Sequence, residues 1–291
     1  AQTINKVEPL FWWTGMKNPE LQLMVYGDYI SEYHPVINEP GVYLKSCVTV
    51  DSPNYLILYL DLSQAHPGTF DITFVNGKKK FVYTYELKER KESTGDIQGY
   101  DSSDVLYLIM PDRFANGDQS NDQIPMSTEY VMDRGKPGAR HGGDLKGIED
   151  HLDYFVDLGV TAIWLNPVLE NDGKGGSYHG YFSTDMFHVD RRLGSNEDYL
   201  RLINKAHQKG LRVVMDMIFN HIGPNHPWVL DVPSKDWFNV SPSKRGNHAK
   251  AIFYDNYAST YDSEVMKYAG FGIDLNQANP HVGKYLIQNS I

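Results

Sequence analysis

Oxygen-bearing side chains are concentrated in one short stretch of this sequence. Residues 112–122 read Asp-Arg-Phe-Ala-Asn-Gly-Asp-Gln-Ser-Asn-Asp. Four carboxylates or carboxamides lie within seven residues there: Asn116, Asp118, Asn121 and Asp122. Calcium takes roughly six to eight hard oxygen ligands, which an acidic loop supplies. The stretch is therefore either a calcium loop, although its spacing is not that of an EF-hand, or a solvated turn, because Asn, Asp and Gly dominate turns.

Three more places could carry chemistry. Gly142-Gly143-Asp144 adds oxygens to the acidic stretch, but Asp144 could equally cap the helix that follows it. A glycine-rich loop ends in Ser-Tyr-His-Gly-Tyr at residues 177–181, and long loops of this kind often bind ligands. Asp216 stands at the end of an apolar run, and His221 follows five residues later. We expect this last pair to face a cleft.

Several other chemistries are poorly supported. The histidines form no His-x-His or His-Glu-x-x-His pattern, which argues against a zinc hydrolase. The sequence lacks the Gly-x-Ser-x-Gly motif of serine hydrolases. No P-loop or dinucleotide fingerprint follows a predicted strand, which argues against a nucleotide cofactor.

The composition narrows the range of partners. Lys and Arg number 27 against 37 Asp and Glu, and the formal net charge is −10. That balance argues against nucleic acid or an anionic membrane surface as the main partner. No apolar run reaches the ~18 residues of a membrane span, so we expect no membrane insertion. The single cysteine, Cys47, excludes an internal disulfide framework.

The first third of the chain predicts a β-sandwich. Short alternating apolar runs lie at 20–26, 47–50, 56–60, 70–74 and 81–85. Asn76-Gly77 between the last two predicts a hairpin in which both turn residues take positive φ. The polar stretch 86–99 predicts a linker. We therefore expect an N-terminal β-sandwich domain over 1–98 and a second domain over 99–291.

The second domain predicts parallel strands alternating with helices. Continuous apolar runs at 105–110, 160–165 and 211–216 are typical of strands buried on both faces. One helix is expected to bury Leu145, Ile148, Leu152, Phe155 and Leu158, and another to bury Leu200, Ile203 and Ala206. Ser195 and Asp198 predict a capping box for the second helix. The remaining length holds about three strand–helix units, so either the sheet is open or the chain is the front of a longer (β/α)₈ barrel, which needs about eight.

Taken together, these motifs resemble the α-amylase superfamily (glycoside hydrolase family 13), in its neopullulanase and cyclomaltodextrinase branch. The resemblance rests on the order of motifs along the chain and on the β-sandwich that precedes them. The motifs are Asp112-Arg113-Phe114, Asn-Gly-Asp at 116–118, Gly-Gly-Asp-Leu-Lys-Gly-Ile at 142–148, Tyr-His-Gly-Tyr at 178–181, and Asp216 to Asn220-His221. The resemblance implies a β-sandwich followed by about the first three βα units of a TIM (β/α)₈ barrel.

The resemblance also implies roles for individual residues. His221 would hydrogen-bond the sugar just before the scissile bond, and Tyr181 would stack on its ring. Asp216 and His179 would support that pocket. A calcium ion (Ca²⁺) would take the Gly142 carbonyl and five side chains: Asn116, Asp118, Asn121, Asp122 and Asp144. Asn220 and Asp274 match a second calcium site of some relatives.

For the whole protein, the resemblance implies a retaining hydrolase of α-1,4 links in maltooligosaccharides, cyclodextrins or pullulan. The family's catalytic carboxylates lie beyond the fourth strand, so we expect no catalytic residue here and no activity from this chain alone. The missing C-terminal part is then an expected partner. The alternatives are a non-catalytic α-glucan-binding protein or a transglycosylase on the same fold.

Three further expectations accompany this reading. Members of the branch often dimerise through the N-terminal domain, which implies a homodimer. The start at Ala1, the single cysteine and a polymeric substrate favour a periplasmic or secreted protein. Gly272-Ile273-Asp274-Leu275-Asn276 stands where the branch usually carries Met-Pro-Lys-Leu-Asn, which leaves the preferred substrate open.

Overall fold

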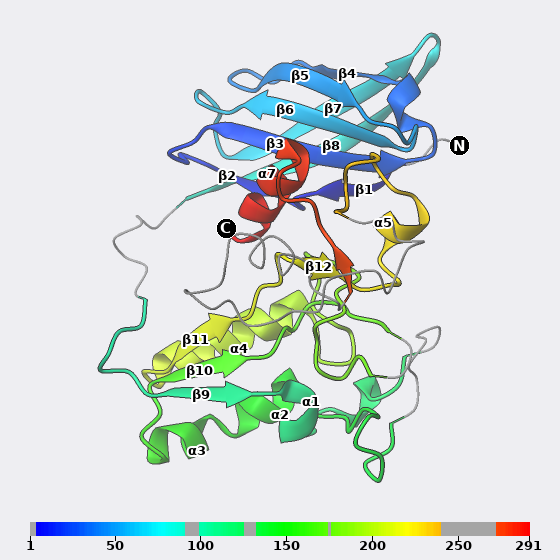
Figure 1. Ribbon diagram of the computed structural model, residues 1–291. Coiled ribbons are helices and arrows are strands. Elements are labelled where there is room, and N and C mark those ends of the chain that lie inside the picture. Colours follow the sequence, from blue (N-terminus) through cyan, green and yellow to red (C-terminus); the bar gives the residue numbers. More distant parts are fainter. Residues whose placement is uncertain (1–3, 91–98, 125–131, 174–175, 240–271) are drawn as a thin grey trace, which may run out of the picture. The chain divides into compact units, whose positions relative to one another are not determined.

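The computed structural model describes residues 4–90, 99–124, 132–173, 176–239 and 272–291 (Figure 1). The chain divides into two compact units. The first comprises Ala1–Gln98, Asp231–Trp237 and Asn276–Ile291, and the second comprises Gly99–Leu230 and Phe238–Leu275. This division differs from the two continuous domains expected from the sequence, because two later segments group with the N-terminal unit. Among the described residues, no helix is both long and apolar enough to cross a membrane.

The predicted β-sandwich is confirmed in the first unit. One four-stranded sheet has the order β1(Ile4–Glu8), β3(Glu20–Gly27), β6(Tyr55–Asp61) and β5(Tyr43–Thr49). The other has the order β2(Trp12–Thr14), β8(Lys79–Glu89), β7(Gly68–Asn76) and β4(His34–Ile37). A short 3-10 helix, η1(Ile30–Glu32), lies between β3 and β4 in the chain.

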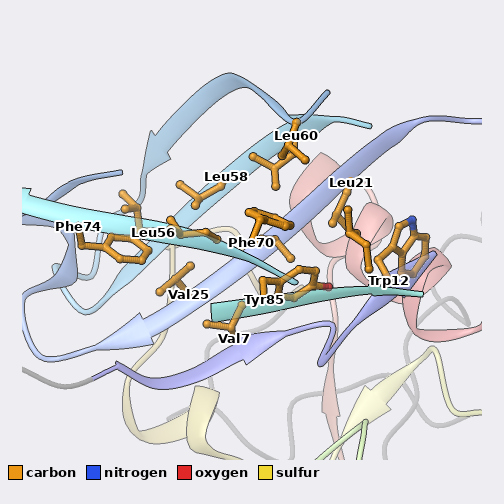
Figure 2. Packing of buried hydrophobic residues seen from close by; sticks show 14 of the residues in the cluster. Val7, Trp12, Leu21, Val25, Leu56, Leu58, Leu60, Phe70, Phe74 and Tyr85 are labelled. Carbon is orange, nitrogen blue, oxygen red and sulfur yellow. The ribbon is translucent and has the colours of Figure 1, made fainter. Parts of the chain in front are cut away.

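Alternation along the strands builds the core of the sandwich (Figure 2). Successive side chains of a strand point to opposite faces, so every second residue enters the space between the sheets. In β6 these residues are Leu56, Leu58 and Leu60, all fully buried. In β7, Phe70 and Phe74 come from the opposite sheet and join the same cluster. The core is therefore apolar throughout.

The hairpin between β7 and β8 corrects two expectations. Asn76 pairs with Lys79, so Gly77 and Lys78 form the loop, and of the two predicted turn residues only Gly77 takes positive φ, at 57°. Asn76 instead ends strand β7 as an ordinary extended residue. Strand β8 continues to Glu89, because it pairs with β7 through Leu87 and with β2 through Glu89. Residues 86–89 are therefore strand rather than linker, and residues 91–98 lie outside the described part of the chain.

Hydrogen bonds between buried polar residues explain why the last segment of the chain groups with the sandwich. Helix α7(Pro280–Asn289) lies beside strand β3 (Figure 1). The Gln22 backbone N–H donates to Gln288 Oε1 at 2.7 Å, and Gln288 Nε2 donates back to the Gln22 carbonyl at 2.8 Å. Tyr285 donates its hydroxyl to Glu8 at 3.0 Å. The helix thus covers the face of β3 that points away from the apolar core, where Gln22 is buried.

The second unit contains the expected parallel sheet. Its order is β11(Arg212–Met215), β10(Ala162–Leu165) and β9(Leu106–Ile109), with β10 in the centre. Both pairings are parallel and continuous in register. The buried side chains of Ile109, Ile163 and Leu165 form one core cluster with those of helices α2(Leu145–Asp150), α3(Leu152–Asp157) and α4(Asn196–Gln208).

The residues that the two predicted helices bury were predicted correctly only in part. Leu145, Ile148, Leu152 and Phe155 are buried as expected, but the helix is broken at His151, and Leu158 is exposed beyond its end. In α4 the capping box of Ser195 and Asp198 is present. However, its buried residues are Tyr199, Leu202 and Ala206, whereas Leu200 is exposed. The stripe is displaced because the bulky Tyr199 takes the core side of the first turn.

Candidate functional site

The end of the parallel sheet places two sequence-predicted residues together. Asp216 is the first residue after β11, and Tyr181 lies on the loop that follows β10. The Tyr181 hydroxyl donates to Asp216 Oδ2 at 2.9 Å. Burial, and then the neighbouring Asp216, raises the pKa of Tyr181 to about 12. Tyr181 therefore remains a neutral hydrogen-bond donor at ordinary pH.

His221 and His179 join the same cluster through the backbone of Tyr181. His221 lies in the short pairing of β12(His221–Ile222) with β13(Ile273–Asp274). Its Nε2 is 3.0 Å from the Tyr181 carbonyl oxygen. His179 Nδ1 accepts from the Tyr181 N–H at 3.0 Å, and the two rings stack with centroids 5.7 Å apart. The structure thus gathers all four residues expected to surround the sugar.

The hydrogen bonds of His221 define its protonation state. Burial lowers the pKa of His221, so the ring is neutral at pH 7 and carries one N–H. That N–H lies on Nε2, because the Tyr181 carbonyl can only accept. The Asn220 side-chain amide is 3.3 Å from the other nitrogen, Nδ1. Both ring nitrogens of His221 therefore have hydrogen-bond partners within the fold.

Gly272 packs directly against the ring of His221. Its φ is +75°, and a Cβ at this position would come within 2.4 Å of the His221 ring. Any residue with a side chain would thus displace the imidazole. Asp274 lies in β13 directly opposite His221, and its Oδ1 accepts from the Asn220 amide at 3.1 Å. The pair predicted for a second calcium ion is thus in direct contact; whether it binds metal stays a prediction.

The acidic loop follows strand β9, and backbone N–H groups of the loop supply some of its hydrogen bonds. It includes the short helices α1(Pro111–Phe114) and η2(Gln119–Asn121). Asp144 is fully buried and caps helix α2, and its carboxylate accepts from the N–H groups of Gly147, Gly117 and Asp118. Burial raises the pKa of Asp144, although these hydrogen bonds oppose the effect. The capping interpretation of Asp144 is therefore confirmed, and it is compatible with a nearby cation.

Unsatisfied oxygens support the calcium interpretation of this loop. Oδ1 of Asn116 and Oδ1 of Asn121 are buried and accept no hydrogen bond within the described residues. Such an atom costs about 1–3 kcal/mol unless a partner is supplied. Asn116 Nδ2 donates to Asp122 Oδ1 at 2.7 Å, and a Cβ on Gly142 would come within 2.6 Å of that Asp122 oxygen. These oxygens fit a hard cation.

The predicted calcium ligands are not a carboxylate-only cluster. Within the described ranges, no three or more side chains of His, Cys, Asp and Glu gather in a way that could hold a metal ion. The three carboxylates of the expected set, Asp118, Asp122 and Asp144, therefore do not form such a cluster. The calcium site stays a prediction, and it depends on the two asparagine oxygens and the Gly142 carbonyl as well as on the carboxylates. Hard oxygen ligands of mixed type are what calcium accepts.

Sequence reasoning missed the ion network behind the loop that carries Tyr181. Asp190 is buried between Arg140 and Arg192, with the Arg192 Nη2 at 2.9 Å and the Arg140 Nη2 at 3.5 Å. Burial works to raise the pKa of Asp190, but the two guanidinium groups hold it below the ordinary value. Arg140 also lies 3.3 Å from the Ser177 carbonyl, at the start of the Tyr-His-Gly-Tyr motif. Arg140 and Asp190 are 50 positions apart in the sequence, so no local motif could have predicted that they pair.

Family comparison decides the identity of both parts. The model described as "Alpha amylase, catalytic domain" matches residues 108–289, and "Cyclomaltodextrinase, N-terminal" matches residues 6–91. The chain belongs to the α-amylase family. The three parallel strands are accordingly the first part of that family's TIM barrel, as the sequence predicted.

Named relatives agree with this assignment. The chain is 36% identical over 220 residues to an intracellular maltogenic amylase of Bacillus subtilis, covering 72% of this chain and 33% of that protein. It is 36% identical over 195 residues to neopullulanase 2 of Thermoactinomyces vulgaris, covering 62% of this chain and 30% of that protein. The chain therefore spans about a third of the length of these curated relatives.

Solved α-amylase structures are also similar. An Anoxybacillus α-amylase is 38% identical with a TM-score of 0.53, over 64% of this chain and 37% of that one. An α-amylase of Geobacillus thermoleovorans complexed with acarbose is 35% identical with a TM-score of 0.50, over 64% and 36%.

The expectation of a periplasmic or secreted protein is wrong. The Bacillus subtilis relative, which matches 72% of the chain, is named as intracellular. A start without methionine and a low cysteine count are compatible with either location, so they carried too little information to decide it.

Proposed function

We propose that this chain contributes the sugar-binding and calcium-binding front part of a retaining α-glucan hydrolase. The observation that carries the proposal is the cluster of Tyr181, Asp216 and His221 at the carboxyl ends of two parallel strands. Active sites of TIM barrels lie at that end. The names of the relatives, maltogenic amylase and neopullulanase, support α-glucans as substrates.

Each residue of the cluster has a distinct task in this proposal. Tyr181 offers its ring face to a glucose unit, and Asp216 fixes the orientation of that ring through the phenol. His221, neutral at pH 7, exchanges one of its two internal contacts for a sugar hydroxyl. Retaining hydrolysis needs two carboxyl groups about 5–5.5 Å apart, and we propose that these come from outside residues 1–291.

Calcium would hold the loop after strand β9 in this proposal. Asn116, Asn121 and Asp122 would bind it together with Asp118, Asp144 and the Gly142 carbonyl. When bound, the ion supplies positive charge that offsets the loop's carboxylates. Its role is structural, because Asp144 in the same set begins helix α2, which packs in the core of the second unit.

Acarbose or maltoheptaose binding tests the proposal on the 291-residue chain. We expect measurable affinity by titration calorimetry, and about a tenfold loss in Tyr181→Ala, equivalent to 1.4 kcal/mol. Tyr100→Ala is the matched control, because Tyr100 is 60% exposed elsewhere in the same unit and should leave affinity unchanged. Equal affinity in both variants would contradict the site.

Turnover assays separate the remaining alternatives. We expect no release of reducing sugar from maltooligosaccharides by the 291 residues alone, and activity once the C-terminal part is supplied. Binding without turnover in that longer protein would favour a glucan-binding protein. Products longer than the substrate would favour a transglycosylase. The homodimer also remains a proposal, which sedimentation of the longer protein would test.

A further inference from the structure

Trp164 shares a hydrogen-bond acceptor with the proposed sugar-stacking residue. Its Nε1–H donates to Asp216 Oδ2 at 3.2 Å, and the Tyr181 hydroxyl donates to the same oxygen at 2.9 Å. Asp216 Oδ2 is therefore held from two directions by two different segments. One donor comes from the central strand β10, and the other comes from the loop that follows it.

Trp164 lies on the face of the sheet that points away from the helices. Its neighbours Ile163 and Leu165 are fully buried against the helices, whereas Trp164 is 37% exposed on the opposite face. It stands in register between Leu108 of β9 and Val214 of β11. The sheet thus fixes the backbone of Trp164 on both sides, which limits where its indole can lie.

A carboxylate with a single donor keeps rotational freedom, because the terminal torsion of Asp is broad. A second donor on the same oxygen restrains that torsion, and hydrogen bonds to a charged acceptor are about twice as strong as neutral ones. The Tyr181 ring stacks on His179, but its hydroxyl is held only as firmly as the carboxylate that it binds. Loss of the indole N–H therefore loosens the Tyr181 ring without removing any contact of that ring.

We propose that Trp164 is a positioning residue, which fixes Asp216 and through it the ring plane of Tyr181 for sugar stacking. This inference rests on the proposed function for its sugar readout, but the hydrogen bond itself can be tested without sugar. A positioning role predicts that Trp164 and Tyr181 act on affinity through one shared atom. Their effects should therefore not be independent.

The test without sugar follows the indole N–H signals of the 291-residue chain by NMR. Trp164→Phe assigns the Trp164 signal by its disappearance and keeps a ring on the strand. We expect that signal to shift in Asp216→Asn and in Tyr181→Phe, while the indole signal of Trp12, in the sandwich core, stays in place. If the Trp164 signal is unchanged in both Asp216→Asn and Tyr181→Phe, the proposal is wrong. Trp164→Phe serves here only to assign the signal.

The test with sugar uses a double-mutant cycle on acarbose affinity. We expect Trp164→Phe to weaken binding about threefold, Tyr181→Phe about threefold, and the double variant clearly less than the ninefold product, since neighbours that share a partner are not additive. A full ninefold loss would overturn the shared role. If the wild-type chain binds no acarbose, the proposed function fails, and the NMR result still decides whether Trp164 orients Asp216.

Discussion

The two units of this chain are stabilised in different ways. The sandwich core is apolar throughout, with Leu56, Leu58 and Leu60 facing the aromatic residues of the opposite sheet. The sandwich also buries Glu8 and Gln22, but these lie outside that core, where they form hydrogen bonds with helix α7. The second unit has an apolar core too, and it buries Asp190 between two arginines. Buried polar groups thus hold a helix on the outer face of a sheet in the sandwich, whereas in the strand–helix unit a buried ion network holds a loop in place.

The largest expected effect is on the buried ion network. Asp190→Ala leaves Arg140 and Arg192 buried without their carboxylate, which should lower the free energy of unfolding of the second unit by about 3–5 kcal/mol. Hydrogen exchange at β9, β10 and β11 measures this. Asp153→Ala removes an exposed partner of Lys209 and should cost less than about 0.5 kcal/mol.

A substitution in the sandwich core, Leu58→Ala, provides the comparison with Asp190→Ala. Leu58→Ala should cost about 2–5 kcal/mol through the cavity that it leaves, with faster exchange in β3 and β6. If Asp190→Ala proves no more harmful than Asp153→Ala, the charge network is not what stabilises the second unit, and the contrast between the units fails.

Calcium removal should affect only the second unit. A cation that binds the folded state at 100 times its Kd adds about 2.7 kcal/mol, so EDTA should lower the Tm and excess calcium should restore it. Asn116→Ala combined with Asn121→Ala should remove the response to EDTA. An identical Tm with and without EDTA in the wild-type chain would exclude the site.

The smallest expected effect is a pH dependence common to both units. Burial lowers the pKa of His221 in one unit and of His281 in the other. The unfolded chain therefore takes up a proton first as pH falls below about 6.5, and stability present above that pH is lost on the way to the folded-state pKa. We expect each histidine to make the protein less stable at pH 5 than at pH 7.

Denaturant unfolding at several pH values measures this slope. His221→Gln should flatten it in the second unit, and His207→Gln, on the surface of α4, should not. If His221→Gln made the loss of stability toward pH 5 steeper instead, His221 would be charged in the folded state, and its assignment as a neutral donor through Nε2 would be wrong.

The sequence predicted those parts of the molecule that depend on local periodicity. Alternation between 70 and 74 predicted the strand β7, and the continuous run at 160–165 predicted the central parallel strand β10. Ser195 and Asp198 are close in sequence, so their capping box could be predicted as well. In helix α4 the helical period alone predicted that Leu200 is buried, but Tyr199 is buried and Leu200 is exposed. The period failed there because more than one face of the helix carries apolar residues.

Tertiary structure alone decided which distant polar groups share a partner. Trp164, Tyr181 and Asp216 come from three separate segments, and nothing in their spacing shows that two of them donate to one oxygen of the third. The pairing of Gln22 with Gln288 is equally invisible along the chain. Periodicity relates residues that are near each other in the sequence, so it can be recognised from the order of residues. A hydrogen bond needs two atoms about 3 Å apart, so it depends on how the complete chain packs.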